Sequence, residues 1–390
     1  MPTLAEKNKC TGCSACYSVC PVQCIEMNAD DKGFLHPNIN TSQCINCKQC
    51  ESVCPIINNY EENDLFSKCY AAFSHDSSIR KESSSGGIFS ELARYVINNN
   101  GVVFGAKYDT KYNVYHDCAT TLEELESLRG AKYSQSTLNN TFKEIKQYLV
   151  QGIMVLFIGT PCQVSGLKSF LKKEYTNLLC VDFVCHGIPS PLAWHSYIDY
   201  FSKVNGKQNI PSRINLRSKK TGWSKYSYCH EFTYDEDTLY CKNEDSLFMK
   251  LFVGDYINRE CCADCNYKGD NRFSDLTIGD FWGIWNICEE MDDNKGTSLV
   301  ITHTGKGELI LKEILSACKY VKMDINAVKQ YNPSYYCSSK INKNREIAFK
   351  LIKSNKIQKC QKFFERKTSI IEKLNITYNH CKHVFSKNTD

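Results

Sequence analysis

The sequence lacks the features that mark membrane-spanning, secreted and nucleic-acid-binding chains. Its longest apolar run, Ile153 to Ile158, is far shorter than the roughly 20 residues that a helix needs to cross a bilayer. No apolar stretch follows Lys7 and Lys9, so we expect no secretory signal. A net charge of +5 over 390 residues predicts no nucleic-acid partner. These absences together predict a cytoplasmic protein.

The chain is long enough for two or three compact units, because single cores stop growing well short of this length. The character of the sequence changes at an acidic, Asn-rich stretch, Asn58 to Asp64, which we interpret as a linker. We divide the chain into a cysteine-dense unit (1–60), two regions of a larger body (65–145 and 146–335) and a Lys- and Asn-rich tail (336–390).

Beyond the linker the sequence predicts a mixed α/β body, because strand-like runs alternate with helix-like ones from Tyr70 onward. The pattern predicts a helix at Ile88–Ile97, a strand at Val102–Tyr108 and a short helix at Leu122–Leu128. The tail has helical periodicity, and we expect its helices to pack on the body. A detached basic arm is the alternative for the tail.

Twenty-four cysteines are the unusual feature of the composition. Small disulfide scaffolds are short and secreted, and this chain has neither property. In a reducing compartment, cysteines at fixed short spacing are better interpreted as metal ligands.

The first 60 residues contain an internal repeat. Cys10-x2-Cys13-x2-Cys16-x3-Cys20-Pro21 recurs as Cys44-x2-Cys47-x2-Cys50-x3-Cys54-Pro55. This run is typical of bacterial ferredoxins with two 4Fe-4S clusters, in which the cysteine before proline ligates the other cluster. The repeat therefore predicts one cluster on Cys10, Cys13, Cys16 and Cys54, and a second on Cys44, Cys47, Cys50 and Cys20.

Zinc is the alternative metal for the repeat, but zinc ribbons use paired Cys-x2-Cys knuckles and not two triple runs that each end in x3-Cys-Pro. Cys24 lies outside the pattern. We interpret it as a small buried hydrophobic residue and not as a ligand.

A third cysteine group is predicted in the body. The segment 152–185 indicates a strand (Ile153–Ile158), a helix (Val164–Glu174) and a second strand (Leu178–Val184). Parallel strands joined in this way would deliver Cys162 and Cys185 to one sheet edge, where open α/β folds bind ligands.

Cys262-x2-Cys265 would complete a set of four thiolates with Cys162 and Cys185. Cys261 competes with Cys262 for this role, and we prefer Cys262 because of the x2 spacing. From spacing alone, buried structural thiols explain Cys162 and Cys185 equally well.

Four segments of the body resemble the coenzyme F420 hydrogenase/dehydrogenase beta-subunit family. They are Gly159-Thr160-Pro161-Cys162-Gln163, Cys185-His186-Gly187-Ile188-Pro189-Ser190, Cys262-x2-Cys265 and Ser274-Asp275-Leu276-Thr277-Ile278-Gly279-Asp280-Phe281-Trp282. Such proteins often carry a fused N-terminal ferredoxin, and they bind FAD close to a 4Fe-4S cluster. The resemblance therefore implies a third cluster on Cys162, Cys185, Cys262 and Cys265, and a flavin nearby.

The flavin site is less visible in the sequence, because no G-x-G-x-x-G follows a strand. Ser83-Ser84-Ser85-Gly86-Gly87 opens the helix at Ile88, and amides and hydroxyls at a helix N-terminus favour an anion such as a flavin phosphate. An ordinary N-cap followed by a tight turn explains the same residues. The resemblance favours the phosphate and implies cofactor roles for Ser84, Ser85, Gly86 and Gly87.

Three more residues have cofactor roles that the resemblance implies. Gly130-Ala131-Lys132-Tyr133 recurs in the family, and Lys132 could neutralise a phosphate or the reduced flavin. Asp280 could line the flavin pocket. The alternatives without a cofactor role are a solvated surface lysine for Lys132 and a turn residue for Asp280. Arg217 and Trp223 also match the family, but no chemistry is assigned to them. For His186 we favour a structural role over a proton relay.

The sequence thus predicts a small bacterial-type ferredoxin module, an α/β body with iron–sulfur and flavin sites, and a helical tail. We expect an oxidoreductase that exchanges electrons with a redox partner protein, such as a ferredoxin or hydrogenase-like subunit, and with a small organic substrate. A flavin-free polyferredoxin and a zinc-stabilised structural protein are the competing hypotheses. The substrate and the direction of electron flow have no signal in the sequence.

Overall fold

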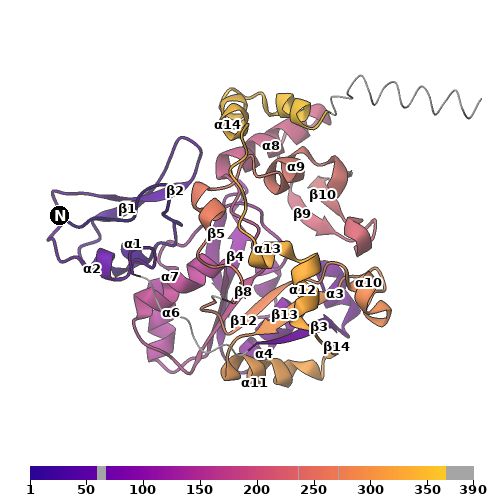
Figure 1. Cartoon of the computed structure of the whole chain (residues 1–390), viewed down its shortest axis with the longest axis horizontal. Helices are drawn as coiled ribbons and strands as arrows, with labels where there is room; N and C mark the ends of the chain where they lie inside the picture. Colours follow the sequence, from indigo (N-terminus) through magenta and orange to yellow (C-terminus); the bar gives the residue numbers. More distant parts are fainter. Residues whose placement is uncertain (59–66, 236, 271, 366–390) are drawn as a thin grey trace, which may run out of the picture.

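The computed structural model describes residues 1–58, 67–235, 237–270 and 272–365. Residues 1–58, which we call the front module, form an antiparallel hairpin and two short helices. These elements are α1 (Ala15–Val19), β1 (Ile25–Ala29), β2 (Leu35–Ile39) and α2 (Gln49–Ser52). The front module projects from one side of the much larger body (Figure 1).

A nine-stranded mixed sheet forms the centre of the body. Its strand order is β14-β3-β13-β12-β8-β7-β4-β5-β6. The bounds are β3 (Lys68–Ser74), β4 (Val102–Tyr108), β5 (Val114–Ala119), β6 (Ser136–Thr137), β7 (Val155–Gly159), β8 (Leu178–Phe183), β12 (Leu276–Asp280), β13 (Ser298–Thr302) and β14 (Cys318–Met323). Strands β4, β7, β8 and β12 run parallel, whereas β13 and β14 pair antiparallel with their neighbours.

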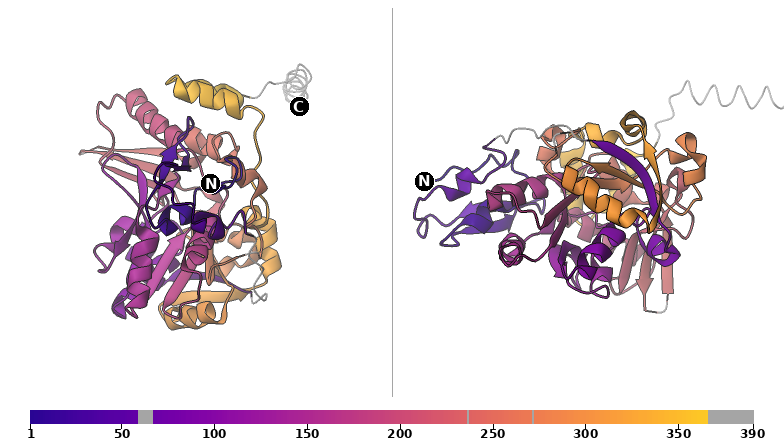
Figure 2. Two further views of the ribbon diagram at one scale, coloured as in Figure 1. Left: turned by 90° about the vertical axis from the view of Figure 1, so that its left-hand side faces the viewer. Right: turned by 90° about the horizontal axis from the view of Figure 1, so that it is seen from below.

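Helices cover both faces of this sheet because its strands are apolar on both sides. On β4, Val103 faces a core formed with α4 (Ile88–Asn98) and α11 (Gly305–Leu315). Its neighbours Val102 and Phe104 face a core formed with α6 (Thr141–Val150) and α7 (Pro161–Leu171). Cys13, Ala15 and Val53 of the front module share this second core. The front module therefore packs on α6 and α7 at one end of the body (Figure 2).

Further helices surround these layers. They are α3 (Ser77–Glu82), α5 (Leu125–Leu128), α8 (Pro191–Val204), α9 (Leu247–Val253), α10 (Ile284–Ile287), α12 (Ile325–Tyr331), α13 (Pro333–Tyr336) and α14 (Arg345–Lys353). Helices α10, α12 and α13 pack over β3 and β13 in a core of their own.

A second antiparallel sheet has the order β11-β10-β9. Its strands are β9 (Arg213–Ser218), β10 (Cys229–Tyr234) and β11 (Asp237–Lys242). Its apolar face forms a separate core with α8, α9 and α14. The described part of the tail, up to residue 365, thus packs on the body as expected, and the rest of the predicted tail lies outside the described residues. Most of the predicted linker also lies outside them.

Several local predictions are confirmed. The helix predicted at 88–97 is α4, the strand predicted at 102–108 is β4, and β7-α7-β8 is a parallel βαβ unit. The helix predicted from Leu122 is shorter, because Glu124 accepts hydrogen bonds from the amides of Thr120 and Thr121 and closes a turn there.

The helix predicted at 164–174 begins and ends three residues earlier, at Pro161 and Leu171. Thr160 caps it through the amide of Gln163, and the Gln163 side chain returns a bond to the amide of Thr160. This capping box and the proline at the first helical position fix the start. Cys162 therefore lies in the first helical turn of α7.

Candidate functional site

The two halves of the cysteine repeat have matching backbones. The residues on either side of the second cysteine of each run are left-handed, with φ of 71° at Gly12 and 62° at Ser14, and 58° at both Asn46 and Lys48. Helices α1 and α2 start directly after these residues. The pseudo-twofold symmetry of the sequence is thus a symmetry of the local structure.

The structure brings the eight repeat cysteines together in two sets. One cavity is lined by Cys10, Cys13, Cys16 and Cys54. A second cavity is lined by Cys20, Cys44, Cys47 and Cys50, with Cys24 beside them. Each run therefore contributes its fourth cysteine to the other cavity, which is the crossed arrangement that the repeat predicted.

The cysteines that line both cavities are not arranged for a single ion, because no three His, Cys, Asp or Glu side chains of the described residues are placed to hold one. Burial, together with the neighbouring thiols of Cys10 and Cys54, raises the pKa of Cys13 to about 12. Thiolates packed in this way need a cationic partner between them, and the iron of a cluster would supply that charge.

Cys24 is closer to the second cavity than the sequence suggested. Its side chain is 3% exposed, and its Sγ lies 3.5 Å from the Sγ of Cys20. The residue is buried, as expected for a small hydrophobic side chain, but it is a fifth thiol within reach of the site.

Four cysteines of the body also come together. Cys162 lies in the first turn of α7, Cys185 follows β8, and the short helix Glu260–Asp264 presents Cys262 and leads into Cys265. Burial raises the pKa of Cys162, and the other three thiols raise it further. Burial raises the pKa of Cys185 to about 12, with further contributions from Cys262 and Cys265. Among the described residues, no three His, Cys, Asp or Glu side chains converge on a single ion-sized point.

The structure distinguishes Cys262 from its neighbour Cys261. Cys262 is among the groups that raise the pKa of Cys162, Cys185 and Cys265, so it faces the other three thiols. Its Sγ also accepts a hydrogen bond from the amide of Ile188 at 3.4 Å. These contacts favour Cys262 as the member of the set.

The first cavity of the front module lies against the body set. A Cβ atom on Gly166 would stand 2.8 Å from the Cβ and 2.9 Å from the Sγ of Cys13, so α7 can approach this cysteine only because residue 166 is glycine. Cys162 lies four residues before Gly166 on the same helix, a rise of roughly 6 Å. The buried Tyr267 lies near Cys13, Cys162 and Cys265. The two cysteine sets are therefore about one helical turn apart.

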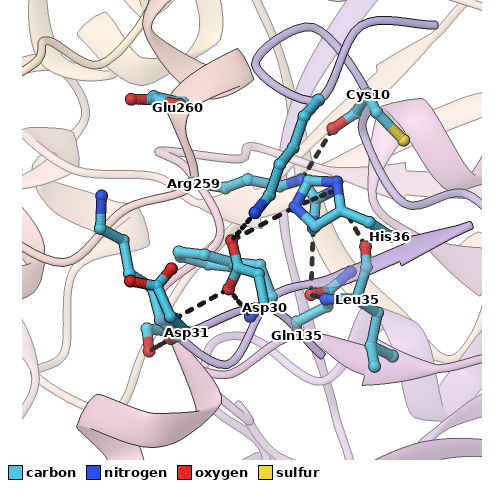
Figure 3. Close-up of polar contacts among 12 residues, drawn as sticks. Cys10, Asp30, Asp31, Leu35, His36, Gln135, Arg259 and Glu260 are labelled. Atoms are coloured by element: carbon cyan, nitrogen blue, oxygen red, sulfur yellow. Dashed lines mark hydrogen bonds and ion pairs between the residues drawn. The ribbon is translucent and has the colours of Figure 1, made fainter. Parts of the chain in front are cut away.

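Arg259, three residues before Cys262, donates hydrogen bonds to Cys10 and Leu35 of the front module (Figure 3). It is 2% exposed, and it donates to the carbonyl oxygens of Cys10 at 2.8 Å and Leu35 at 2.9 Å, and to Oε1 of Gln135 at 3.2 Å. The ring of His36 lies 3.1 Å from the same guanidinium. Burial and the Arg259 charge lower the pKa of His36 to about 4, so this ring is neutral at pH 7. Arg259 thus ties a front-module cysteine to the segment that carries Cys262.

A buried arginine organises the residues predicted to hold a flavin. Arg217 is 4% exposed and donates to Oδ2 of Asp280 at 2.8 Å, to the hydroxyl of Tyr133 at 3.3 Å and to the carbonyl of Ser84 at 3.4 Å. Its guanidinium lies 3.9 Å from the ring centre of Tyr228. No role for Arg217 was expected from the motifs, yet it brings Ser84, Tyr133 and Asp280 together.

Several buried polar atoms in this region have no partner among the described residues. They are Oγ of Ser84, Nε of Arg217, Oδ1 of Asp280 and the hydroxyl of Tyr108, which lies near Tyr133. Unpaired buried polar groups are costly, so each requires an explanation such as a bound molecule. Donors, acceptors and aromatic rings in this combination fit a flavin.

The other predicted flavin residues are partly engaged within the protein. The hydroxyl of Ser85 donates to the carbonyl of Thr297 at 2.9 Å, and the amide of Gly86 donates to Oγ of Ser298 at 2.9 Å. Gly87 caps α4 with a φ of 94°. Ser84 therefore retains the free hydroxyl of this segment, whereas the Gly86 amide is not available to a phosphate.

Two lysines border the same region. Lys132 is half-buried, and its Nζ donates to the carbonyls of Arg129 at 2.7 Å and Gly130 at 3.2 Å. Burial lowers its pKa to about 7, so it is not an ordinary solvated lysine. Lys219 donates to the carbonyls of Arg80 and Ser85, and burial together with the charges of Arg80 and Arg217 lowers its pKa to about 7. A bound anion would stabilise the charged form of both side chains.

The body of the chain matches the models of a known protein family. Residues 153–328 match the model for the C-terminal part of the coenzyme F420 hydrogenase/dehydrogenase beta-subunit family, and residues 69–143 match the model for its N-terminal part. The chain belongs to this family. Residues 9–56 match a 4Fe-4S dicluster domain. The family member therefore carries a fused iron–sulfur module, and the resemblance inferred from the motifs is confirmed.

One solved structure similar to this family member is a chain of the F420-reducing NiFe hydrogenase complex from Methanosarcina barkeri, studied by xenon derivatisation. It has 18% sequence identity and a TM-score of 0.48, and the match covers 80% of this chain and 98% of that chain. No curated protein matches the chain.

Two other predictions for this family member can be compared with the structure. Nδ1 of His186 lies 3.3 Å from Oγ of Ser334 and Nε2 lies 2.9 Å from Oδ1 of Asp255, so both ring nitrogens are satisfied, as a structural role requires. In the part of the chain that the structure describes, no helix is both long and apolar enough to cross a bilayer.

Proposed function

We propose that the chain is an iron–sulfur flavoprotein oxidoreductase that moves electrons between a redox partner protein and a small organic substrate. The observation that carries this proposal is the succession of cysteine sets. The set with the exposed Cys47 lies outermost, and the set with Cys13 lies against Gly166 of α7. The body set begins with Cys162, one helical turn before Gly166 on the same helix.

In this proposal the two front-module sets would each hold a 4Fe-4S cluster, with Cys20 and Cys54 exchanged between the halves. Cys162, Cys185, Cys262 and Cys265 would hold a third. When bound, the clusters supply one-electron transfer, and a flavin couples it to two-electron chemistry. The chain's own contribution is to hold the sets close together, through Gly166 and Arg259, and to bury them.

We further propose that FAD lies beside Arg217. The unpaired Oγ of Ser84, Nε of Arg217 and Oδ1 of Asp280 support this site, as do Lys132 and Lys219, whose lowered pKa values of about 7 a bound phosphate would raise. Tyr133, Ser85, Gly86 and Gly87 would shape its wall. A deazaflavin is one candidate for the organic substrate, because the description of the family names coenzyme F420.

Anaerobic quantitation of iron, sulfide and flavin per chain tests the proposal. We expect about twelve irons, about twelve sulfides and one FAD, from three cubane clusters and one flavin. Iron and sulfide without flavin would support the competing polyferredoxin, in which the chain only carries electrons between partners. Zinc without iron or sulfide would contradict both hypotheses.

Single cysteine variants test the ligand assignment. Replacing Cys13 or Cys162 by alanine is expected to remove about four irons per chain, because a cubane that loses a protein ligand is labile. Cys69→Ala is the matched control, since Cys69 is 2% exposed and lies in a different core. Cys24→Ala decides its role: unchanged iron would keep it as a buried hydrophobic residue, and a loss of about four irons would make it a ligand.

The pH dependence of FAD binding tests the flavin site. Lys219 has a lowered pKa of about 7 in the free protein, so above pH 7 it is neutral and must take up a proton when a phosphate binds. The charged and polar groups that act on it are Arg80, Arg217, Asp280 and Asp293. FAD affinity should therefore fall above pH 7, by up to about tenfold per pH unit for one coupled proton.

Quenching of flavin fluorescence would measure this affinity between pH 6 and 9. Lys219→Met should bind FAD more weakly and with a shallower pH dependence. The exposed neighbour Lys220 provides the control, and Lys220→Met should retain the wild-type profile. A flat wild-type profile would place the phosphate away from Lys219.

A further inference from the structure

A groove runs along the junction of the front module and the body. Its walls are α1 and the turn after it on one side, and α6 and α7 on the other, and Cys20 is part of its lining. The groove holds about 770 Å³ and opens widely to solvent, so it does not enclose a ligand on all sides. Its openness suits contact with another protein surface.

The lining of the groove is basic. It contains Lys143, Lys146 and Lys172 and no acidic residue. Glu144, on the same helix α6, lies outside the lining of the groove. Lys143 lies over the ring of Tyr17, Lys146 over the ring of Phe170, and Lys172 donates to Oγ of Ser52 at 3.3 Å. Within the described residues, these contacts leave the three positive charges without a carboxylate partner.

Apolar side chains lie exposed beside the lysines. Val150 is 69% exposed in the groove, and Val22 (40%) and Ile45 (61%) line the adjoining cavity that contains Cys20 and Cys47. Small apolar contacts surrounded by charge are typical of transient protein–protein interfaces, in which charge steers the encounter.

We propose that this basic groove is the docking surface for an acidic protein that carries one electron at a time. The inference deepens the proposed function and rests on it. Docking here would bring the carrier beside Cys20 and the outer set of cysteines. The reduced carrier loses one electron and the front module gains one, so no bond forms or breaks and no proton has to move.

A stopped-flow measurement tests the proposal with the intact, cluster-loaded protein. The probe is a strongly acidic bacterial two-cluster ferredoxin, added in its reduced form. The variant carries Lys143→Glu, Lys146→Glu and Lys172→Glu. The control carries Lys81→Glu, Lys111→Glu and Lys203→Glu, which changes the net charge equally at exposed positions outside the groove. Binding of the same ferredoxin, measured by calorimetry, provides a readout that is independent of electron transfer.

We expect the groove variant to lower the second-order rate constant at least about tenfold and to weaken ferredoxin binding, since steering contributes about 10- to 1,000-fold to association. We expect the wild-type rate constant to fall with rising salt, and the rate constant of the groove variant to be nearly independent of salt. The control variant should behave like wild type in both assays. A groove variant with wild-type rate and binding would overturn the proposal, as would an equal loss in the control.

Dithionite, which needs no docking surface, separates this inference from the proposed function. If dithionite bleaches the iron–sulfur absorbance of all three proteins equally, a change seen with ferredoxin belongs to docking. If dithionite leaves the wild-type absorbance unchanged, the proposed function itself fails. Self-association of the wild-type chain that the groove variant abolishes would assign the groove to a second copy and overturn the inference.

Discussion

Replacing Arg259 by leucine is expected to loosen the front module from the body about 100-fold and to interrupt the path between the cysteine sets. The substitution removes the donors to the carbonyls of Cys10 and Leu35, whereas Oε1 of Gln135 keeps its hydrogen bond from the amide of Leu35. Each buried acceptor left without a partner costs roughly 1–3 kcal/mol. A total near 3 kcal/mol corresponds to about a factor of 100 in the docking equilibrium.

Hydrogen exchange gives a local measure of this change. The amide of Leu35 donates to Oε1 of Gln135 at 2.9 Å across the junction, so its protection reports the docked state. In the Arg259→Leu variant this amide should exchange about 100-fold faster, while amides of β7 and β8 keep their protection. Electron paramagnetic resonance of the reduced protein should show weaker magnetic interaction between front-module and body clusters.

Two further variants sharpen the Arg259 experiment. Arg259→Lys keeps the charge but not the planar fork of donors, so it should recover only part of the protection. Arg80→Leu is the matched control, because Arg80 is 5% exposed and anchors Asp293 and Gly296 far from the front module. Unchanged exchange at Leu35 in a folded Arg259→Leu protein would show that the packing of α1 on α7 alone holds the junction.

The sequence predicted those parts of the site that depend on local spacing. The repeat of the front module specifies both cavity sets because three cysteines of each lie within seven residues. The β7-α7-β8 unit was visible because its strands are apolar runs separated by one helix. Cys262 and Cys265 were found because an x2 spacing close to a family motif is a local signal.

The residues that sequence reasoning missed act over long sequence separations. Arg259 is 249 residues from Cys10, and Arg217 is 63 residues from Asp280 and 133 from Ser84. No periodicity or spacing marks such pairs. The same applies to Gly166, whose importance depends on the position of Cys13 and not on its own helix. The antiparallel insertion of β13 between β3 and β12 is likewise a long-range choice.

The second large effect is expected at a buried ion pair beneath the body set. Asp182 at the end of β8 has a side chain that is 0% exposed, and Nη1 of Arg272, whose side chain is 1% exposed, lies 3.1 Å from its Oδ2. Thr277 donates its hydroxyl to the other carboxylate oxygen. Arg272 also donates to the carbonyl of Gly269 at 3.1 Å, so it fastens the loop after Cys265 to the strand before Cys185.

Arg272→Met should lower the free energy of unfolding by roughly 3–5 kcal/mol at pH 8, because it leaves an uncompensated charge on Asp182. The double variant Asp182→Leu/Arg272→Met should recover much of this loss, since a buried pair replaced by apolar groups is often neutral. Asp182→Leu alone should be as harmful as Arg272→Met, because it leaves the buried guanidinium of Arg272 without a carboxylate partner. Urea denaturation of the anaerobic protein, followed by tryptophan fluorescence, would measure all four proteins.

The pH dependence of the Arg272→Met loss gives an independent check of its cause. Burial raises the pKa of Asp182 even with Arg272 present, and removing the arginine must raise it further. A carboxyl with a raised folded-state pKa destabilises the fold progressively as pH rises from its unfolded value towards the folded one. The loss should therefore be smaller at pH 5 than at pH 8. Equal losses at both pH values would mean that Asp182 is not left charged, and that the variant weakens the fold only through lost packing on Tyr335, whose ring centre lies 4.7 Å from the guanidinium.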